Sequence, residues 1–514
     1  MLRDFENQKQ NSNGVTRREF VQTGGLGVLG MGLAGGLPPG QVRAAQPLPP
    51  LHPPLAKGGT EGGSGFGKAK SVIVLFLYGA PSQMDTLDPK PEAPEEVRGE
   101  FNAIRTSMPG VLACEHLPNI AKNLHRACLL RSMTHTSNNH AVSVALSGLR
   151  ESLPVIEANG NDSRHQPYFG SVLEYLWKQQ GISMEATGIP INMVLPWALN
   201  AKTDPGRWQH HAAWLGRAYN PVIPVFQGQG TLEIGPPSIR GVTPILTRFD
   251  PWDGVTPASS FTLDGLQLPA DVSSSRLDAR RSLLAGVERP EPGRLRGSAR
   301  QPYDHYRDHA LAMITNPGLA RVLDVTCEPQ RLRERYGLNL FAQSALSARR
   351  LIEAGVKVVT VFWDTWIDNN AAWDTHNNHH PRLKDGLCPK LDQLLPAFLD
   401  DMETRGLLDE TLVLVISEHG RTPAITRTAG GGREHWAGAY WGLFFGAGIK
   451  TGQVIGATDR QGAYPVSRPT HPNDILATLY HLLGFDPHAT TTPNRLGQPM
   501  PLLSHGEAVS EMLV

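Results

Sequence analysis

A cluster of histidines lies between residues 376 and 435, where five of the 19 histidines alternate with carboxylates. Imidazole nitrogens and carboxylate oxygens without thiolates are a ligand set that suits zinc or manganese, or calcium where carboxylates dominate. Each histidine taken alone is more typical of an ordinary loop residue, but the joint pattern predicts a metal site. The residues of this pattern are Asp374, His376, Glu418, His419 and His435.

These polar groups follow apolar runs of the kind that forms strands buried on both faces of a parallel sheet. The strongest runs are Ser71–Leu77, Val356–Phe362 and Leu412–Ile416. The carboxyl ends of such strands share one edge of the sheet, and ligands bind there. Weaker runs of the same type are Cys128–Met133, Ile189–Leu195 and Gly442–Phe445.

Helical patterns separate the late strands. Leu340–Glu353 stops at Gly355, the apolar positions from Leu391 to Met402 keep helical spacing, and Pro472 opens a further helix. This alternation predicts an α/β fold with a doubly wound, mostly parallel sheet and helices on both faces. Between about 200 and 300 the pattern gives way to Pro, Gly, Ser and Arg, which predicts a long loop-rich insertion.

Composition excludes several classes of protein. Lys and Arg together number 48 and Asp and Glu together number 48, so neither a nucleic-acid footprint nor a polybasic membrane patch is expected. A hydrophobic fraction of 40% excludes global disorder. The four cysteines form no CxxC pair, which argues against a zinc knuckle.

The N-terminus is predicted to be a targeting segment. Thr16–Val21 resembles a twin-arginine export signal, and the apolar stretch Gly24–Leu37 is too short and too rich in glycine for a membrane anchor. We therefore expect a signal peptide at 1–44, a Pro/Gly-rich linker at 45–70 and one domain at 71–505. The twin-arginine machinery would export the chain to the periplasm or another extracytoplasmic compartment, without a stable membrane span.

Several strings together resemble the family called domain of unknown function 1501, and they extend over nearly all of 71–490. That family looks like a branch of the alkaline-phosphatase-like superfamily of phosphatases, arylsulfatases and cofactor-independent phosphoglycerate mutases. The resemblance implies a doubly wound sheet, two metal ions and a hydroxyl nucleophile near the end of an early strand. The strings are Gly79–Ser82, Asp85–Lys90, Glu334–Gly337, Trp373–His376, Ser417–Pro423, Gly432–Trp436 and the helix Asp474–Gly484.

The resemblance also implies roles for the late residues. Glu418 and His419 stand where the superfamily has an Asp-His metal-ligand pair, and His435 stands where it has a late metal histidine. Asp374 matches the aspartate of an Asp-x-x-x-His element, but position 378 is asparagine. The residues left to replace that second ligand are His376, Asn378 and His380.

The early residues match less well. Tyr78 occupies the usual region of the first-strand aspartate, and Asp85 is the displaced candidate for that metal ligand. The candidate nucleophiles lie in or just after the run Cys128–Met133, with Thr136 and Ser137 preferred and Ser132 and Thr134 as further hydroxyls. Arg421 or Arg433 would hold substrate oxygens in a bidentate fork.

One motif match is set aside. Cys327 begins a Cys-x-Pro-x-Arg string of the type that sulfatases convert to formylglycine. In those enzymes the cysteine follows the first strand closely, whereas Cys327 lies 250 positions after Leu77. We therefore interpret the match as coincidence.

These observations lead to two functional hypotheses. The first is an exported hydrolase of phosphate or sulfate esters that acts on a small-molecule or glycan ester and uses one or two divalent ions, zinc or manganese rather than calcium. The second is a non-catalytic surface or interaction protein with a degenerate metal site. Tyr78 and Asn378 favour the second hypothesis, whereas Glu418, His419 and His435 favour the first.

Overall fold

The computed structural model describes residues 64–514, and Glu61–Val514 forms one compact unit. The predicted signal peptide lies outside the described residues, as does the predicted linker up to residue 63. The segments within 64–514 that are not described are 161, 203–210, 235–247, 264–271, 273, 288–306, 308–309, 315 and 367–371.

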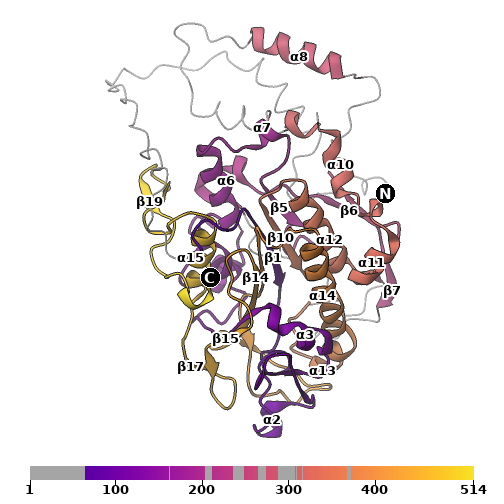
Figure 1. Ribbon diagram of the computed structural model, residues 1–514, viewed down its shortest axis with the longest axis vertical. Coiled ribbons are helices and arrows are strands. Elements are labelled where there is room, and N and C mark those ends of the chain that lie inside the picture. Colours follow the sequence, from indigo (N-terminus) through magenta and orange to yellow (C-terminus); the bar gives the residue numbers. More distant parts are fainter. Residues whose placement is uncertain are drawn as a thin grey trace, which may run out of the picture. The chain divides into compact units, whose positions relative to one another are not determined.

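A seven-stranded sheet forms the centre of the unit (Figure 1). Within it β14 runs antiparallel to both of its neighbours, and the other pairings are parallel. The predicted mostly parallel α/β sheet is therefore confirmed, and all six apolar runs form strands of it. In sheet order these strands are β15 (Gln453–Ile455), β4 (Cys128–Met133), β14 (Tyr440–Gly446), β11 (Thr411–Ile416), β1 (Ser71–Leu77), β10 (Val358–Trp363) and β5 (Asn192–Leu195).

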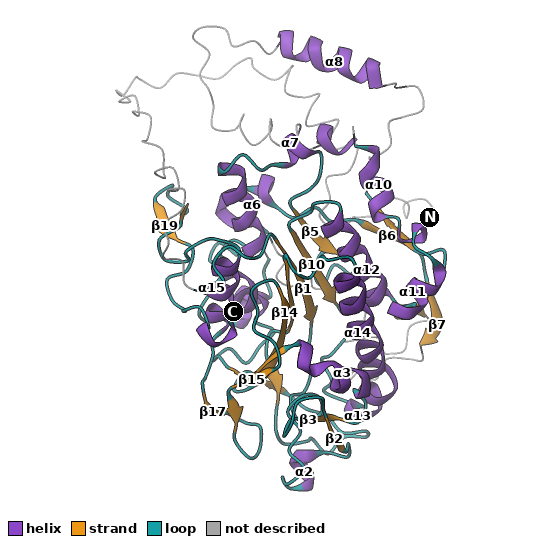
Figure 2. Ribbon diagram, in the orientation of Figure 1, coloured by secondary structure: helices purple, strands orange, loops and turns teal. Residues whose placement is uncertain are grey.

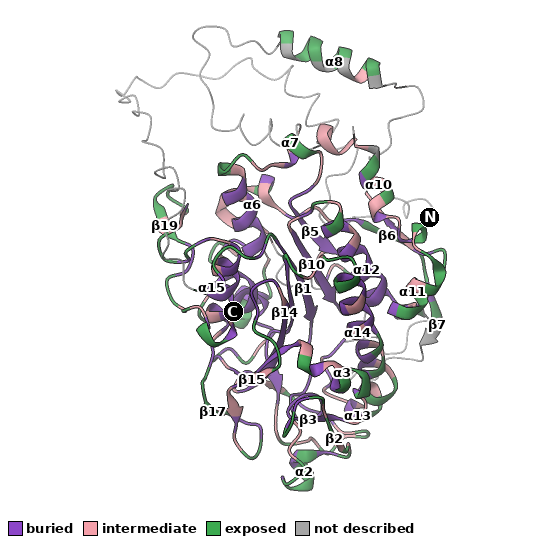
Figure 3. Cartoon of the chain, viewed as in Figure 1, coloured by how far each residue is buried: buried purple, intermediate pink, exposed green. Residues whose placement is uncertain are grey.

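Helices cover both faces of the sheet, and strand β1 shows why its sequence is continuously apolar (Figures 1 and 3). Its odd-numbered residues Ile73, Leu75 and Leu77 join the core cluster shared with α3 (Pro118–Asn123), α12 (Leu340–Glu353) and α14 (Cys388–Thr404). Its even-numbered residues join the cluster shared with α4 (Val142–Ser147), α6 (Phe169–Gln179) and α15 (Pro472–Leu482). Each fully buried aliphatic side chain contributes roughly 1.5–3 kcal/mol, so both faces stabilise the strand.

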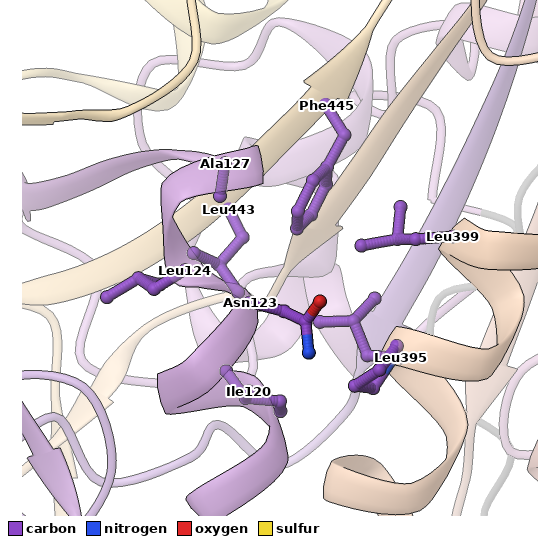
Figure 4. A pocket seen from close by; sticks show the side chains of 9 residues that line it. Ile120, Asn123, Leu124, Ala127, Leu395, Leu399, Leu443 and Phe445 are labelled. Carbon is purple, nitrogen blue, oxygen red and sulfur yellow. The ribbon is translucent and has the colours of Figure 1, made fainter. Parts of the chain in front are cut away.

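The contact between α3, α14 and β14 shows how tightly one of these cores packs (Figure 4). The crevice between them has a volume of about 10 Å³, which is close to the space that one water needs. Its lining is almost entirely apolar, so we assign it a packing role. The residues labelled there are Ile120, Asn123, Leu124, Ala127, Leu395, Leu399, Leu443 and Phe445.

Shorter elements surround the sheet (Figure 2). The stretch predicted as a loop-rich insertion contains more regular structure than its sequence pattern indicated, because β6 and β9 have only three residues each and β8 contains Pro251 and Gly254. These strands pair as β6 with β9 and β7 with β8, and a helix, α8, follows. The elements of this stretch are β6 (Val225–Gln227), β7 (Gly230–Ile234), β8 (Arg248–Val255), β9 (Ser260–Thr262) and α8 (Ser274–Val287).

The other short strands form small pairs, and the other short helices connect larger elements. None of the helices in the described part of the chain is both long enough and apolar enough to cross a bilayer. The remaining elements are α2 (Glu95–Arg98), β2 (Ala103–Arg105), β3 (Leu112–Cys114), α5 (Pro154–Glu157), α7 (Met184–Thr187), α10 (Pro317–Leu323), α11 (Gln330–Tyr336), α13 (His379–Arg382), β12 (Gly420–Arg421), β13 (His435–Trp436), β16 (Ala457–Thr458), β17 (Pro465–Ser467), β18 (Thr491–Pro493) and β19 (Pro499–Pro501).

Candidate metal centre

The polar residues converge because four parallel strands end at the same edge of the sheet. Gly79 follows β1, Asp374 follows β10, Glu418 follows β11 and His140 follows β4. The Gly79 N–H donates to Oε1 of Glu418 at 2.7 Å, which joins the loops that follow β1 and β11. The edge predicted from the apolar runs is therefore the edge at which these residues meet.

Gly79 also allows the Asp374 loop to approach the end of β1. Its φ of 91° lies in the left-handed region, and a Cβ at this position would stand 2.3 Å from the backbone nitrogen of Asp374. A side chain would therefore displace Asp374 from the site.

The hairpin of β12 and β13 brings in the last histidine. Its register pairs Arg421 with His435 and Gly420 with Trp436. Because β12 begins immediately after the Glu418-His419 pair, this pairing places His435 beside residues that follow β11.

Three predicted ligands form a compact group, which we call the open triad: Asp374, His376 and His435. Nε2 of His376 lies 2.9 Å from Oδ1 of Asp374 and 3.1 Å from Nε2 of His435. Nε2 of His435 in turn lies 3.2 Å from Oδ1 of Asp374. Two ligands bound to one ion at about 2.1 Å are about 3 Å apart, so this spacing fits a single metal. The side chains of Asp374, His435 and His376 are 17%, 23% and 33% exposed, so the triad leaves room for further ligands.

His419 lies deeper and is prepared to bind a metal. Its Nδ1–H donates to the carbonyl of Gly420 at 2.7 Å, which leaves the lone pair on Nε2. Within the described structure this buried Nε2 has no hydrogen-bond partner. Burial, together with His435, Arg421 and His140, holds the pKa of His419 well below its usual value and keeps the ring neutral. Such a buried, unpaired lone pair fits a cation.

His140 connects the deep and the open parts of the site. Its Nδ1 lies 2.8 Å from Oε1 of Glu418 and its Nε2 lies 3.2 Å from Oδ2 of Asp374, while the ring stacks on Tyr78. Burial lowers the pKa of His140, but the two carboxylates outweigh that effect and raise it. The sequence analysis did not select His140, although its position after the run Cys128–Met133 was a usable signal.

Arg421 was predicted to hold substrate oxygens, but its guanidinium contacts groups of the protein itself. It is fully buried and donates to the carbonyl of Ala80 at 3.2 Å, to that of Arg433 at 3.1 Å and to that of Gly79. It also pairs with Oδ1 of Asp374. Burial by itself would raise the pKa of Asp374, but Arg421 and His140 hold it well below its usual range. Most of the guanidinium donors are therefore committed to the protein.

Asp85 belongs to a second group, which we call the closed cluster: Asp85, His379 and Arg433. Nε of Arg433 lies 2.6 Å and Nε2 of His379 lies 2.9 Å from Oδ2 of Asp85, and all three side chains have no exposed surface. Burial opposes ionisation, but Arg433 and His379 hold the pKa of Asp85 far below its usual value. The structure thus places Asp85, predicted as a metal ligand, in an ion pair outside the open triad.

The predicted nucleophiles have partners away from the ligands. The Oγ of Ser137 accepts the N–H of Ser152 at 2.9 Å, and Oγ of Ser132 donates to the carbonyl of Arg468. Thr136 is exposed. The hydrogen bonds of the two serines lead to backbone groups rather than to the open triad.

The chain belongs to the family described as "Protein of unknown function (DUF1501)", whose model matches residues 69–513. This agrees with the resemblance that the sequence strings indicated. None of the curated proteins compared with the chain matches it.

Solved structures match it remotely. The PsFucS1 sulfatase from Pseudoalteromonas sp. is 12% identical with a TM-score of 0.36, and the match covers 81% of this chain and 68% of that one. An alkaline phosphatase superfamily protein from Vibrio parahaemolyticus is 11% identical with a TM-score of 0.35, and the match covers 83% of this chain and 69% of that one. A phosphonate monoester hydrolase from Silicibacter pomeroyi is 12% identical with a TM-score of 0.31, and the match covers 86% of this chain and 76% of that one.

Proposed function

We propose that the protein is a metal-dependent hydrolase of phosphate or sulfate esters that acts outside the cytoplasm. The open triad carries this proposal, because three ligand atoms from two separate loops stand within 3.2 Å of one another at the solvent-facing edge of the sheet. A catalytic metal site keeps a position free for substrate or water, and the partial exposure of these side chains provides it.

The donor set favours zinc or manganese. Two imidazoles and one carboxylate form the triad, and the unpaired Nε2 of His419 lies nearby, whereas calcium prefers oxygen ligands throughout. When bound, such an ion polarises the ester and lowers the pKa of a coordinated water.

The chain's own residues supply orientation and proton transfer. The backbone carbonyl of Gly420 holds the His419 ring with its lone pair on Nε2, and Arg421 keeps Asp374 ionised. His140 is the nearest group that can carry a proton between Glu418 and Asp374, since one nitrogen faces each carboxylate. The substrate class, a small-molecule or glycan ester, follows the resemblance to the phosphatase and sulfatase superfamily.

The second candidate function is metal-dependent binding without catalysis. Two observations favour it. The candidate nucleophile Ser137 accepts the N–H of Ser152, and Arg421, the candidate for holding substrate oxygens, pairs with Asp374. Such a protein would retain the metal and bind oxyanions without cleaving them.

Activity is tested with the purified mature protein. We expect it to retain a divalent metal and to hydrolyse an aryl phosphate or an aryl sulfate, to lose that activity on chelation, and to regain it with Zn²⁺ or Mn²⁺. Protein that contains metal but is inert on both esters supports the binding function, and protein without affinity for either ion rejects both proposals.

Export is a separate part of the proposal and rests on Thr16–Val21. The double substitution Arg17→Lys/Arg18→Lys should leave the precursor in the cytoplasm, as fractionation and immunoblotting would show. The matched substitution Arg3→Lys, which lies outside the signal string, should leave export unchanged. Unimpaired export of the double variant would reject the twin-arginine route.

A further inference from the structure

Two buried guanidinium groups stand beside the acidic residues of this edge. Arg421 pairs with Asp374, and Arg433 pairs with Asp85 through Nε at 2.6 Å and NH2 at 3.3 Å. Both arginine side chains have no exposed surface. A buried charge of this kind must be balanced locally, because the removal of an ion from water is unfavourable.

A count of the formal charges limits the number of metal ions. The four carboxylates Asp85, Asp374, Glu418 and Glu434 contribute four negative charges, and Arg382, Arg421 and Arg433 cancel three of them. With every histidine counted as neutral, one divalent ion would leave the centre with a single positive charge, which an anionic ester can neutralise. A second ion would leave three positive charges in a largely buried site.

The grouping of the potential ligand residues also indicates a single metal ion. Two of the three groups with metal-ligand spacing share His435: Asp374, His376 and His435 form one, and His140, His419 and His435 form the deeper one. The third group is Asp85, His379 and His380, in which Arg433 and His379 already contact Oδ2 of Asp85 and Thr375 contacts Nδ1 of His379. A neutral imidazole has one lone pair, because its other nitrogen carries a proton. His435 therefore ligates one ion, and the two groups that share it are alternative surroundings of that ion.

The contacts of Asp85 explain why a second metal-binding position lacks a ligand. The superfamily resemblance implies two ions, and Asp85 was the early carboxylate available for the other one. Arg433 and His379 instead occupy Oδ2 of Asp85, and Arg433 also reaches Oδ1.

We infer that the centre binds one divalent ion per chain, at the open triad, and that Arg421 is a fixed positive charge in place of a second ion. This inference rests on the proposed metal-dependent function and makes it more specific. Arg421 thus acts as a positioning residue on Asp374.

The decisive measurement is the metal content of the mature protein, determined by native mass spectrometry and elemental analysis after dialysis against Zn²⁺. We expect one ion per chain and one anomalous scattering peak, located between Asp374, His376 and His435. Two ions per chain would overturn the inference while leaving a metal-dependent hydrolase intact. A chain without metal would overturn both.

A charge-neutral exchange tests the closed cluster. The double variant Asp85→Asn/Arg433→Gln removes both charges together, and we expect it to keep one ion per chain. Loss of the ion from folded double variant would show that Asp85 is a ligand and overturn the inference. If this variant does not fold, the metal count and the anomalous peak of the wild-type chain still decide.

Arg421 is tested by calorimetric titration of metal-free protein with Zn²⁺. Removing a positive charge beside the ligand Asp374 should tighten binding, so we expect Arg421→Gln to lower the Kd about tenfold or more. Arg421→Lys should retain more of the wild-type Kd, and Arg164→Gln, at an exposed ion pair with Asp162, should match wild type. An unchanged or higher Kd for Arg421→Gln would overturn the role given to Arg421.

Discussion

The open triad and the closed cluster use similar side chains in different surroundings. Each contains one aspartate paired with a buried arginine and with at least one histidine. The triad is 17–33% exposed and brings two histidine nitrogens onto one carboxylate oxygen, whereas the closed cluster has no exposed surface. In the closed cluster the arginine and the histidine together satisfy the same oxygen, Oδ2 of Asp85.

This difference shows that residue type alone does not make a ligand. Both ring nitrogens of His379 are hydrogen-bonded: Nε2–H donates to Asp85, and Nδ1 accepts from the hydroxyl of Thr375. No lone pair therefore remains for a metal. His419 has its Nδ1 bound to a backbone carbonyl and its Nε2 unpaired. An unpaired nitrogen alone does not separate the two clusters, because Nε2 of His380, 3.9 Å from Oδ1 of Asp85, is also buried without a partner in the described structure. Solvent access therefore distinguishes the open triad from the closed cluster.

The largest expected effect comes from removing a ligand of the open triad. Asp374→Ala and His435→Ala should each lose the bound metal and lower kcat/KM by about a thousandfold or more, because the metal stabilises the charge that develops in the transition state. Elemental analysis and ester hydrolysis measure the two effects together. His488→Ala, at an exposed histidine, is the control and should retain both. Triad variants that keep their metal would show that the ion binds elsewhere.

The next effect is on stability and comes from the closed cluster. Asp85→Ala leaves the buried Arg433 without its counter-ion, and breaking a buried pair in this way costs about 3–5 kcal/mol. Urea unfolding would measure the loss, which should be smaller for Asp85→Asn/Arg433→Gln. A cost below about 1 kcal/mol for Asp85→Ala would mean that the pair is not structural.

The dependence of stability on pH sharpens the same comparison. Burial lowers the pKa of His379 to about 4 from an ordinary value of 6.5. The unfolded chain therefore takes up this proton at a higher pH than the folded one. The contribution of His379 to stability is complete above pH 6.5 and is lost as the pH falls from 6.5 to about 4, by at most about 3 kcal/mol.

His379→Gln should remove this part of the pH dependence, because glutamine can still hydrogen-bond to Asp85 and Thr375 but does not titrate. Unfolding free energies of both proteins between pH 4 and 7 give the comparison. Parallel curves would contradict the assignment of a neutral His379 to the closed cluster.

The smallest effect should come from a residue that belongs to neither cluster. Cys327 is exposed, and its thiol lies 3.8 Å from Oδ2 of Asp324. Cys327→Ala should leave metal content unchanged and kcat/KM within about twofold, since surface substitutions away from a site have little effect. A large loss of sulfatase activity would revive the formylglycine interpretation that the position of Cys327 argues against.

Much of the fold was predictable because strands and helices leave local patterns. The runs Ser71–Leu77 and Cys128–Met133 match β1 and β4 residue for residue, and the helical pattern Leu340–Glu353 matches α12. The strands β6 and β9 were not predicted, because three residues are too few to show alternation.

The sequence by itself determined the sheet edge and the late ligand strings, because strand order and short-range spacing are local properties of the chain. It did not determine the role of His140, whose partners Glu418 and Asp374 are 278 and 234 positions away. Nor did it separate Asp85 from the open triad, since its partner Arg433 lies 348 positions along the chain. Whether an aspartate ligates a metal or balances an arginine depends on which charges the tertiary structure places within a few ångströms of it.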